Sequence, residues 1–265
     1  MHLNKYYYYE KHAKMQLKHS YYHFQHAISP EDCQRIIDLG TSQLERERSE
    51  GKNVEAYTFG DSQKGAMPGA APQGDATKQD LKNNGINNAY VRDSEVTWLR
   101  ESWLYDLFHP LINRANREPG WNWQWDSSEN FQFTVYKPGG FYSWHKDGMS
   151  DHFGAYKRYI YGVTPEALKA NGNPPFGYTL DDGLVGKVRK ISMTCNLNVP
   201  GEYDGGNLMF DFGHHHEGDQ FHECTEIRPQ GSVIVFPSFI DHCVSPLTRG
   251  TRYSLVLWNL GDPFR

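Results

Sequence analysis

The segment KISMTCNLNV, residues 190–199, alternates apolar and polar side chains along its whole length. Successive side chains of a β-strand point to opposite faces, so this alternation predicts a strand with one face on a hydrophobic core. One face holds Ile191, Met193, Cys195, Leu197 and Val199, and the other holds Ser192, Thr194, Asn196 and Asn198.

Further runs of β-favouring residues, separated by turn-forming residues, surround this segment. They are NFQFTVY (130–136), GNLMFDF (206–212), SVIVFP (232–237) and TRYSLVLW (251–258). Helical patterns precede these strands and do not alternate with them, which argues against βαβ units. We therefore expect a mainly β chain, an antiparallel sandwich or barrel braced by helices.

Two helices are predicted before the strands. SPEDCQRIIDLGTSQLE (29–45) has Ser29 as a candidate N-cap, Pro30 at the first helical position and apolar residues at helical spacing. SEVTWLRESWLYDLFHPLINRAN (94–116) shows a helical pattern through Trp103, Leu107 and Leu111 and ends before the turn-forming REPG. We expect this second helix to back a sheet.

All 265 residues are expected to form a single domain. Residues 1–27 mix Tyr, His and Lys, which suits stacking on single-stranded nucleic acid, but an irregular arm packed on the domain is favoured because the chain is acidic. Residues 45–90 are expected to form a polar surface excursion. The connection 151–190 is long enough to be a lid or substrate loop, and the alternative is a peripheral insertion.

The composition and net charge of the chain exclude some classes of protein. The chain is 38% hydrophobic and 14% aromatic, as in packed globular proteins, and its net charge of -5 argues against a general nucleic-acid binder. Its four cysteines show no metal-site or disulfide spacing, and neither a signal peptide nor a membrane span is recognised. We expect a cytoplasmic protein with reduced thiols that acts on small molecules, peptides or proteins.

The segment FYSWHKDGM (141–149) places His145 and Asp147 on the same side of an extended chain. A third ligand-type residue, His242, lies in SFIDHCVSPLTRGTRYSLVLW (238–258), ten residues before Arg252. Antiparallel strands joined by the turn-like SPLTRG are expected to bring His242 and Arg252 to one cavity.

This residue set indicates a metal centre. Two histidines and one carboxylate occupy one face of an octahedral ion, the arrangement of non-haem Fe(II) sites with exchangeable positions. A guanidinium binds a carboxylate through two charge-assisted hydrogen bonds, so Arg252 suits the far end of a dicarboxylate cosubstrate, and Ser254 adds a hydroxyl.

In these motifs the chain resembles the Fe(II)- and 2-oxoglutarate-dependent dioxygenases, and within them the prolyl 4-hydroxylase-like, PKHD-type hydroxylases. The segments that carry the resemblance are SPEDCQRIIDL, YKPGGFYSWHKD, NVPGEYDGGNLMF and HCVSPLTRGTRYSLVLW. The resemblance implies a double-stranded β-helix (jelly roll) that holds iron through His145, Asp147 and His242. It also implies that Tyr136 hydrogen-bonds 2-oxoglutarate and that Arg252 binds its distal carboxylate. Collagen-type enzymes have lysine there, so the arginine favours the PKHD or oxygen-sensor-like branches.

Other residues near these motifs are open to two interpretations. Phe141, Tyr142, Trp144 and Trp258 could shield the cavity from water, although core packing is favoured for Phe141 and Trp144. Thr194 and Asn196 are expected to face the interior, and Cys243 to point away from the metal. The histidine run 214–216 could form a second metal cluster, but a polar loop is favoured.

The function that the resemblance implies is hydroxylation of an unactivated carbon, with a peptidyl proline as the leading target. Its cofactors are Fe(II), 2-oxoglutarate and O2, with ascorbate as an optional addition. Hydroxylation of a free amino acid or small metabolite, and a catalytically silent jelly-roll binding module, are the alternatives. Oxidative demethylation of nucleic acid needs a basic groove near the pocket, and only the N-terminal arm offers such residues.

Overall fold

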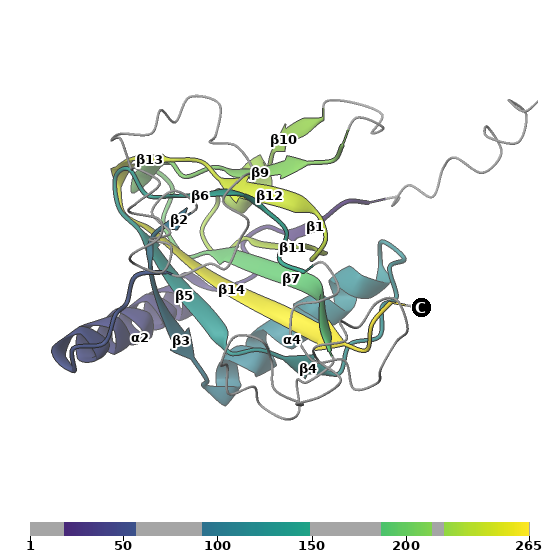
Figure 1. Cartoon of the computed structure of the whole chain (residues 1–265), viewed down its shortest axis with the longest axis horizontal. Helices are drawn as coiled ribbons and strands as arrows, with labels where there is room; N and C mark the ends of the chain where they lie inside the picture. The colour runs from purple at the N-terminus through teal and green to yellow at the C-terminus, as the bar shows by residue number, and fades with distance from the viewer. Residues whose placement is uncertain (1–18, 57–91, 149–186, 214–219, 265) are drawn as a thin grey trace, which may run out of the picture.

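Antiparallel sheets and two helices make up the part of the chain that the computed structural model describes, residues 19–56, 92–148, 187–213 and 220–264 (Figure 1). The predicted mainly β, jelly-roll class is confirmed. Most of the predicted polar excursion, most of the predicted lid or substrate loop and the histidine run 214–216 lie outside the described residues.

The larger sheet has the strand order β1-β11-β7-β14-β5-β3, and β4 pairs with β14 beside β5. Its strands are β1 (Tyr22–Phe24), β3 (Glu95–Leu99), β4 (Ser127–Ser128), β5 (Phe131–Tyr136), β7 (Val188–Asn196), β11 (Val233–Pro237) and β14 (Arg252–Gly261). The ten-residue β14 is central, paired with β5 on one side and β7 on the other. All five strands predicted from the sequence are present, four of them in this sheet.

A smaller sheet has the order β10-β9-β12-β6-β2, and a separate pair is formed by β13 and β8. The bounds are β2 (Arg92–Asp93), β6 (Phe141–His145), β8 (Tyr203–Gly205), β9 (Leu208–Asp211), β10 (Phe221–Glu223), β12 (Asp241–Val244) and β13 (Leu247–Gly250), with a short 3-10 helix η2 (Thr225–Ile227). The smaller sheet lies across the inner face of the larger one, so the two make a sandwich (Figure 1).

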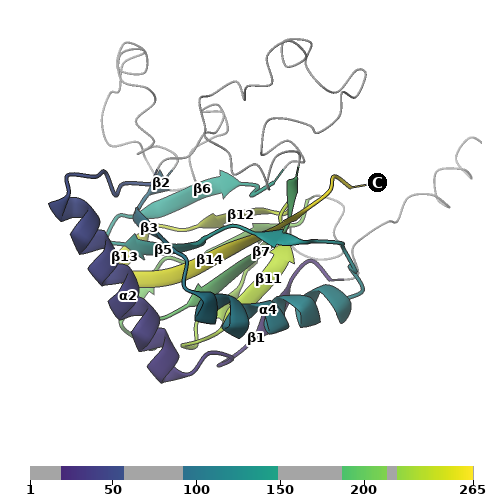
Figure 2. The same cartoon turned by 90° about the horizontal axis from the view of Figure 1, so that it is seen from below.

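Helices α2 (Pro30–Ser49) and α4 (Ser102–Arg117) cover the outer face of the larger sheet (Figure 2). Ser29 caps α2 as predicted, since its hydroxyl accepts a hydrogen bond of 3.0 Å from the backbone N–H of Asp32. Gly40 allows α2 to approach the sheet closely: a Cβ there would lie 2.3 Å from the ring of Phe133. Neither helix is long and apolar enough to cross a membrane.

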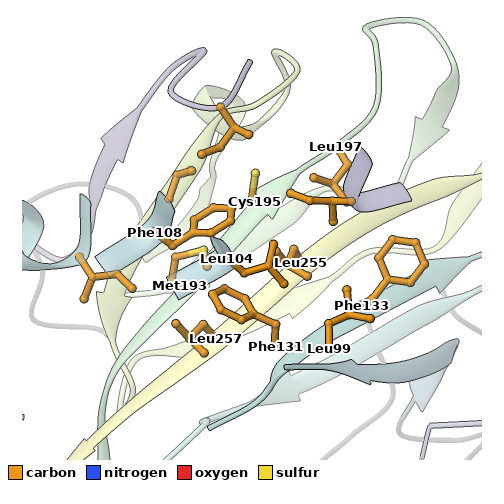
Figure 3. Packing of buried hydrophobic residues seen from close by; sticks show 14 of the residues in the cluster. Leu99, Leu104, Phe108, Phe131, Phe133, Met193, Cys195, Leu197, Leu255 and Leu257 are labelled. Carbon is orange, nitrogen blue, oxygen red and sulfur yellow. The ribbon is translucent and has the colours of Figure 1, made fainter. Parts of the chain in front are cut away.

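The main core fills the space between the helices and the larger sheet (Figure 3). The apolar face of the segment 190–199 contributes to this core, in which Met193, Cys195 and Leu197 are fully buried. In β14, Leu255 and Leu257 point to the same core. The alternate residues of these strands therefore face the smaller sheet, which is where a polar site can form.

The predicted helix 94–116 is wrong in its first part. Residues Glu95–Leu99 form strand β3 and pair with β5, because this run holds β-branched and aromatic residues and places alternate side chains in the core. The buried face of α4 is also shifted by one residue from the predicted one, to Leu104, Phe108 and Ile112.

Three predicted boundaries also change. The N-terminal arm is not irregular throughout, since Tyr22–Phe24 pairs with β11 as an edge strand. Helix α2 continues to Ser49, inside the predicted polar excursion. Strand β7 begins at Val188, inside the predicted lid or substrate loop.

All four cysteines are unpaired and buried, as the sequence indicates. Burial raises the pKa of the Cys243 thiol to about 12, so this thiol stays protonated at neutral pH and reacts poorly.

Candidate metal and cosubstrate site

Three ligand-type side chains meet on the inner face of the smaller sheet. His145 ends β6, Asp147 follows it, and His242 lies on β12 directly opposite His145 in the antiparallel register. The Nε2 atoms of His145 and His242 lie 3.6 and 3.5 Å from the two carboxylate oxygens of Asp147. One ligand atom from each residue lies within 4.8 Å of the others, a spacing that fits a single metal ion. The predicted convergence of these three residues is confirmed.

Backbone contacts fix the orientation of both imidazoles. The Nδ1 atom of His145 lies 2.7 Å from the carbonyl oxygen of Ser143, and that of His242 lies 3.0 Å from the carbonyl oxygen of Ile240. A carbonyl oxygen only accepts hydrogen bonds, so both Nδ1 atoms must carry the proton. The Nε2 lone pairs are left free and point to Asp147, as a metal site requires.

The charge states also suit metal binding. Burial would raise the pKa of Asp147, but the neighbouring imidazoles of His242 and His145 hold it well below its usual range. Burial lowers the pKa of His242 to about 4, and the nearby His145 adds to this effect. At neutral pH the site therefore presents an ionised carboxylate and a neutral His242, which are the forms that bind a metal.

Asp147 is held in place by the chain around it. The backbone N–H of Gly148 donates to the carbonyl oxygen of Ser238 at 3.0 Å, and the carbonyl oxygen of Asp147 accepts from Arg189 at 3.3 Å. Arg189 is itself paired with the carboxylate of Glu129. Although Asp147 lies beyond the end of β6, its carboxylate is thus directed at the two histidines.

A cavity joins this triad to the inner face of the larger sheet. Its polar wall includes Tyr136 from β5 and Arg252 and Ser254 from β14, the three residues predicted to bind the cosubstrate. Arg252 pairs in register with Tyr136, and its guanidinium lies 5.4 Å from the centre of that ring. The structure therefore brings all six predicted site residues to one cavity.

Among the residues that the structure describes, none is a partner for the charge of Arg252. It is 2% exposed, and within the described residues it makes no hydrogen bond or ion pair; its Nε is buried without an acceptor. An isolated buried charge is costly unless it is paired. This end of the cavity therefore has the chemistry of a carboxylate-binding site.

His242 and Arg252 reach the cavity by a different route from the one predicted. They do not lie on paired strands joined by a turn: β12 belongs to the smaller sheet and β14 to the larger, and the residues between them form β13, which pairs with β8. The two side chains face each other across the sandwich.

Some of the remaining residues considered from the sequence line the cavity, and others do not. Tyr142, Trp258 and Thr194 line it. Phe141 and Trp144 do not line it, but both are only half-buried and belong to no hydrophobic core cluster of the described residues, so the favoured core-packing role is not confirmed. Asn196 does not line it either, because its amide donates to the carbonyl oxygens of Asn198 and Arg228. Cys243 is buried away from the cavity, as predicted.

Sequence reasoning missed one charged residue of the cavity, Arg92 on β2. It is 6% exposed, and its Cζ lies 4.6 Å from the centre of the Tyr142 ring, which in turn stacks on His145 with ring centres 3.5 Å apart. The sequence gives little sign that Arg92 belongs to the cavity. It lies just before the run SEVTWL, and the helical pattern predicted for 94–116 includes that run.

Comparisons with known proteins agree with this geometry. The family model of the 2OG-Fe(II) oxygenase superfamily matches residues 131–259, a range that contains all six predicted site residues. A PKHD-type hydroxylase of Synechococcus sp. (strain CC9605) is 33% identical over 92 residues, which make up 34% of this chain and 38% of that protein. The PKHD-type hydroxylase YbiX of Shigella sonnei (strain Ss046) is 29% identical over 101 residues, 36% of this chain and 42% of YbiX. Each match spans less than half of the relative.

Solved structures with the same fold include two prolyl hydroxylases. A prolyl-4-hydroxylase of Pseudomonas putida superposes with a TM-score of 0.50 at 16% identity and covers 91% of this chain and 92% of its own. A prolyl hydroxylase from Trichoplax adhaerens, solved in complex with a hypoxia inducible factor oxygen degradation domain peptide fragment, gives 0.51 at 14% identity, with 91% and 83% covered. Residues 131–259 of this chain thus match the family model of the 2OG-Fe(II) oxygenase superfamily, and the fold is similar to that of solved prolyl hydroxylases.

Proposed function

We propose that the chain is an Fe(II)- and 2-oxoglutarate-dependent hydroxylase in which His145, Asp147 and His242 hold the metal. The observation that carries this proposal is the convergence of these three residues, from two strands nearly a hundred positions apart, within 4.8 Å. Two neutral imidazoles and one carboxylate are the donor set of non-haem Fe(II) sites. They leave coordination positions for a cosubstrate and for O2.

We further propose that 2-oxoglutarate lies between the triad and Arg252. The guanidinium of Arg252 binds the distal carboxylate, which gives this buried charge the partner that it lacks within the described protein. Tyr136 and Ser254 line the same cavity, and in this proposal their hydroxyl groups donate further hydrogen bonds to 2-oxoglutarate. A catalytically silent jelly-roll binding module would not require both the three metal ligands and Arg252.

When bound, the ferrous ion and 2-oxoglutarate supply the oxidative chemistry that transfers one oxygen atom from O2 to a C–H bond of the substrate. The chain itself orients these groups. The backbone carbonyls of Ser143 and Ile240 hold both imidazoles with Nε2 toward the metal, and Tyr142 stacks on His145. Tyr142 and Trp258 exclude water from the wall of the cavity.

For the substrate we propose a peptidyl proline. The similarity to PKHD-type hydroxylases and to prolyl hydroxylase structures, one of them a peptide complex, supports this choice. A free amino acid or a small metabolite is the alternative.

The test is a turnover experiment with short proline-containing peptides, Fe(II), 2-oxoglutarate and O2. The expected result is a peptide that gains the mass of one oxygen atom in step with the 2-oxoglutarate consumed. His242→Ala, which removes one proposed ligand, is expected to lose both signals. If 2-oxoglutarate binds and is consumed but no peptide gains oxygen while a free amino acid does, the peptide part of the proposal is wrong and the oxygenase part stands.

A further inference from the structure

Arg92 is a second buried arginine in the same cavity, and all of its hydrogen-bond partners are neutral. Its Nε donates to the hydroxyl of Ser94 at 2.8 Å, and its Nη2 donates to Gln132 at 2.9 Å and to Thr134 at 3.3 Å. Within the described residues no carboxylate pairs with it, and its Nη1 makes no hydrogen bond. These contacts fix the guanidinium plane without neutralising its charge.

The charges of the cavity do not balance once the cofactors are bound. Among the described residues, the charged ones that line it are Asp147, Arg252 and Arg92. A ferrous ion, the carboxylate of Asp147 and dianionic 2-oxoglutarate together carry one negative charge, which Arg252 neutralises. The positive charge of Arg92 then remains, buried at 6% exposure. A buried charge of this kind indicates a missing anionic partner.

Arg92 lies close to the metal site. Its guanidinium packs on the Tyr142 ring, which stacks on the proposed ligand His145. Trp258 also lines the cavity, and its Nε1 is buried with no acceptor among the described residues. Two unused donors on the cavity wall are what an acceptor-rich substrate group requires.

We infer that the substrate presents a carboxylate to Arg92 close to the carbon that is oxidised. This inference rests on the proposed function, because it assumes that 2-oxoglutarate occupies Arg252. The carboxylate comes either from the α-carboxyl group of a free or C-terminal residue or from an acidic side chain beside the target residue. Both sources offer the same carboxylate oxygens to Nη1, the guanidinium nitrogen of Arg92 that makes no hydrogen bond within the described residues.

The first test uses a simple anion and needs no knowledge of the substrate. Wild-type protein is loaded anaerobically with Mn(II) and saturating 2-oxoglutarate, and the relaxation of ¹³C-labelled acetate by the metal is measured, with acetamide as the neutral control. We expect saturable binding of acetate and none of acetamide. R92Q should weaken acetate binding by about 10- to 100-fold, the effect of one lost charge-assisted interaction. R92K should recover part of it, and R35Q, at an exposed arginine of α2, should not change it.

Two outcomes overturn the inference: wild-type protein that does not bind acetate, or R92Q that binds it as well as wild type does. Binding of 2-oxoglutarate to the Mn(II)-loaded protein is measured first, by the relaxation of ¹³C-labelled 2-oxoglutarate, and if it fails to bind, the proposed function fails. A thermal unfolding curve for each variant shows that it is folded.

The second test identifies the source of the carboxylate. L-Proline is compared with L-prolinamide, and acetyl-Pro-Glu-amide with acetyl-Pro-Gln-amide, as substrates for oxygen transfer. The acid of one pair should be favoured by about 10- to 100-fold in wild type, with the preference lost in R92Q. The first pair reports an α-carboxylate and the second an acidic side chain. Equal turnover of acid and neutral partner in both pairs contradicts the inference.

Discussion

Replacing Arg252 by methionine should have opposite effects on ligand binding and on the stability of the ligand-free protein. The side chain is 2% exposed and makes no hydrogen bond or ion pair with the described residues, so it gives up no protein partner when it binds a carboxylate. Removing one member of a buried charge pair costs about 2 to 5 kcal/mol, which corresponds to a loss of 2-oxoglutarate affinity of about 30-fold to several thousand-fold. Without ligand, the same change removes a desolvated, unpaired charge, so the free energy of unfolding should stay the same or rise.

The assay is an anaerobic titration of the Fe(II)-loaded protein with 2-oxoglutarate, followed by the weak visible charge-transfer band, together with chemical unfolding of the ligand-free protein. Arg249→Gln is the matched control, because Arg249 is an exposed arginine three positions away that pairs with Asp204 outside the cavity. It should leave the affinity unchanged. An unchanged affinity in Arg252→Met would refute the assignment of Arg252. A large loss of ligand-free stability would show that the guanidinium is held by other interactions.

Three further predictions concern stability and can be checked by chemical unfolding. Ser29→Ala removes the hydroxyl that caps α2 and should lower the free energy of unfolding by about 1 kcal/mol, whereas Ser29→Asp should largely preserve it. Gly40→Ala should cost about 1 to 3 kcal/mol by overpacking, since the added Cβ would lie 2.3 Å from the ring of Phe133; an unchanged stability would mean that α2 can move away from the sheet at no cost. Burial would raise the pKa of Glu95, but its ion pairs with Arg48 and Lys137 outweigh this effect and lower the pKa, so the ionised carboxylate stabilises the fold at pH values above its ordinary pKa. Glu95→Gln should therefore lower the free energy of unfolding by at most about 1 kcal/mol at pH 7. The difference between the two proteins should vanish as the pH falls through the lowered pKa.

The strands and the metal site could be predicted because their signals are local or chemically specific. The alternation in 190–199 indicates a strand with one apolar and one polar face, and His145 and Asp147 share a side at a spacing of two. The sequence predicts a helix at Glu95–Leu99 because these five residues continue the apolar pattern of the helix that follows them. Only the pairing with β5 shows that Glu95–Leu99 is a strand. The helical periodicity of apolar residues also does not distinguish the face of Trp103, Leu107 and Leu111 from the adjacent face of Leu104, Phe108 and Ile112. Packing of α4 against the sheet decides which of the two is buried.

Contacts between distant segments could not be predicted from spacing. Arg92 has no motif around it, and its role as a cavity residue depends on β2 pairing with β6, which places it over Tyr142. His242 and Arg252 lie ten residues apart, but the sequence does not show that the intervening residues form a strand of their own and carry the chain from one sheet to the other. The six proposed site residues were predictable, but Arg92 and the path of the chain between these residues were not.

Calorimetric titration of the purified protein with Fe(II) under anaerobic conditions tests the metal centre most directly, with wild type compared with His145→Ala and with His23→Ala, an exposed histidine of β1. Wild type and His23→Ala should each bind a single ion tightly, and His145→Ala should lose this binding while its unfolding curve remains cooperative. Equally tight binding of Fe(II) by His145→Ala would contradict the assignment of His145, Asp147 and His242 as the metal ligands.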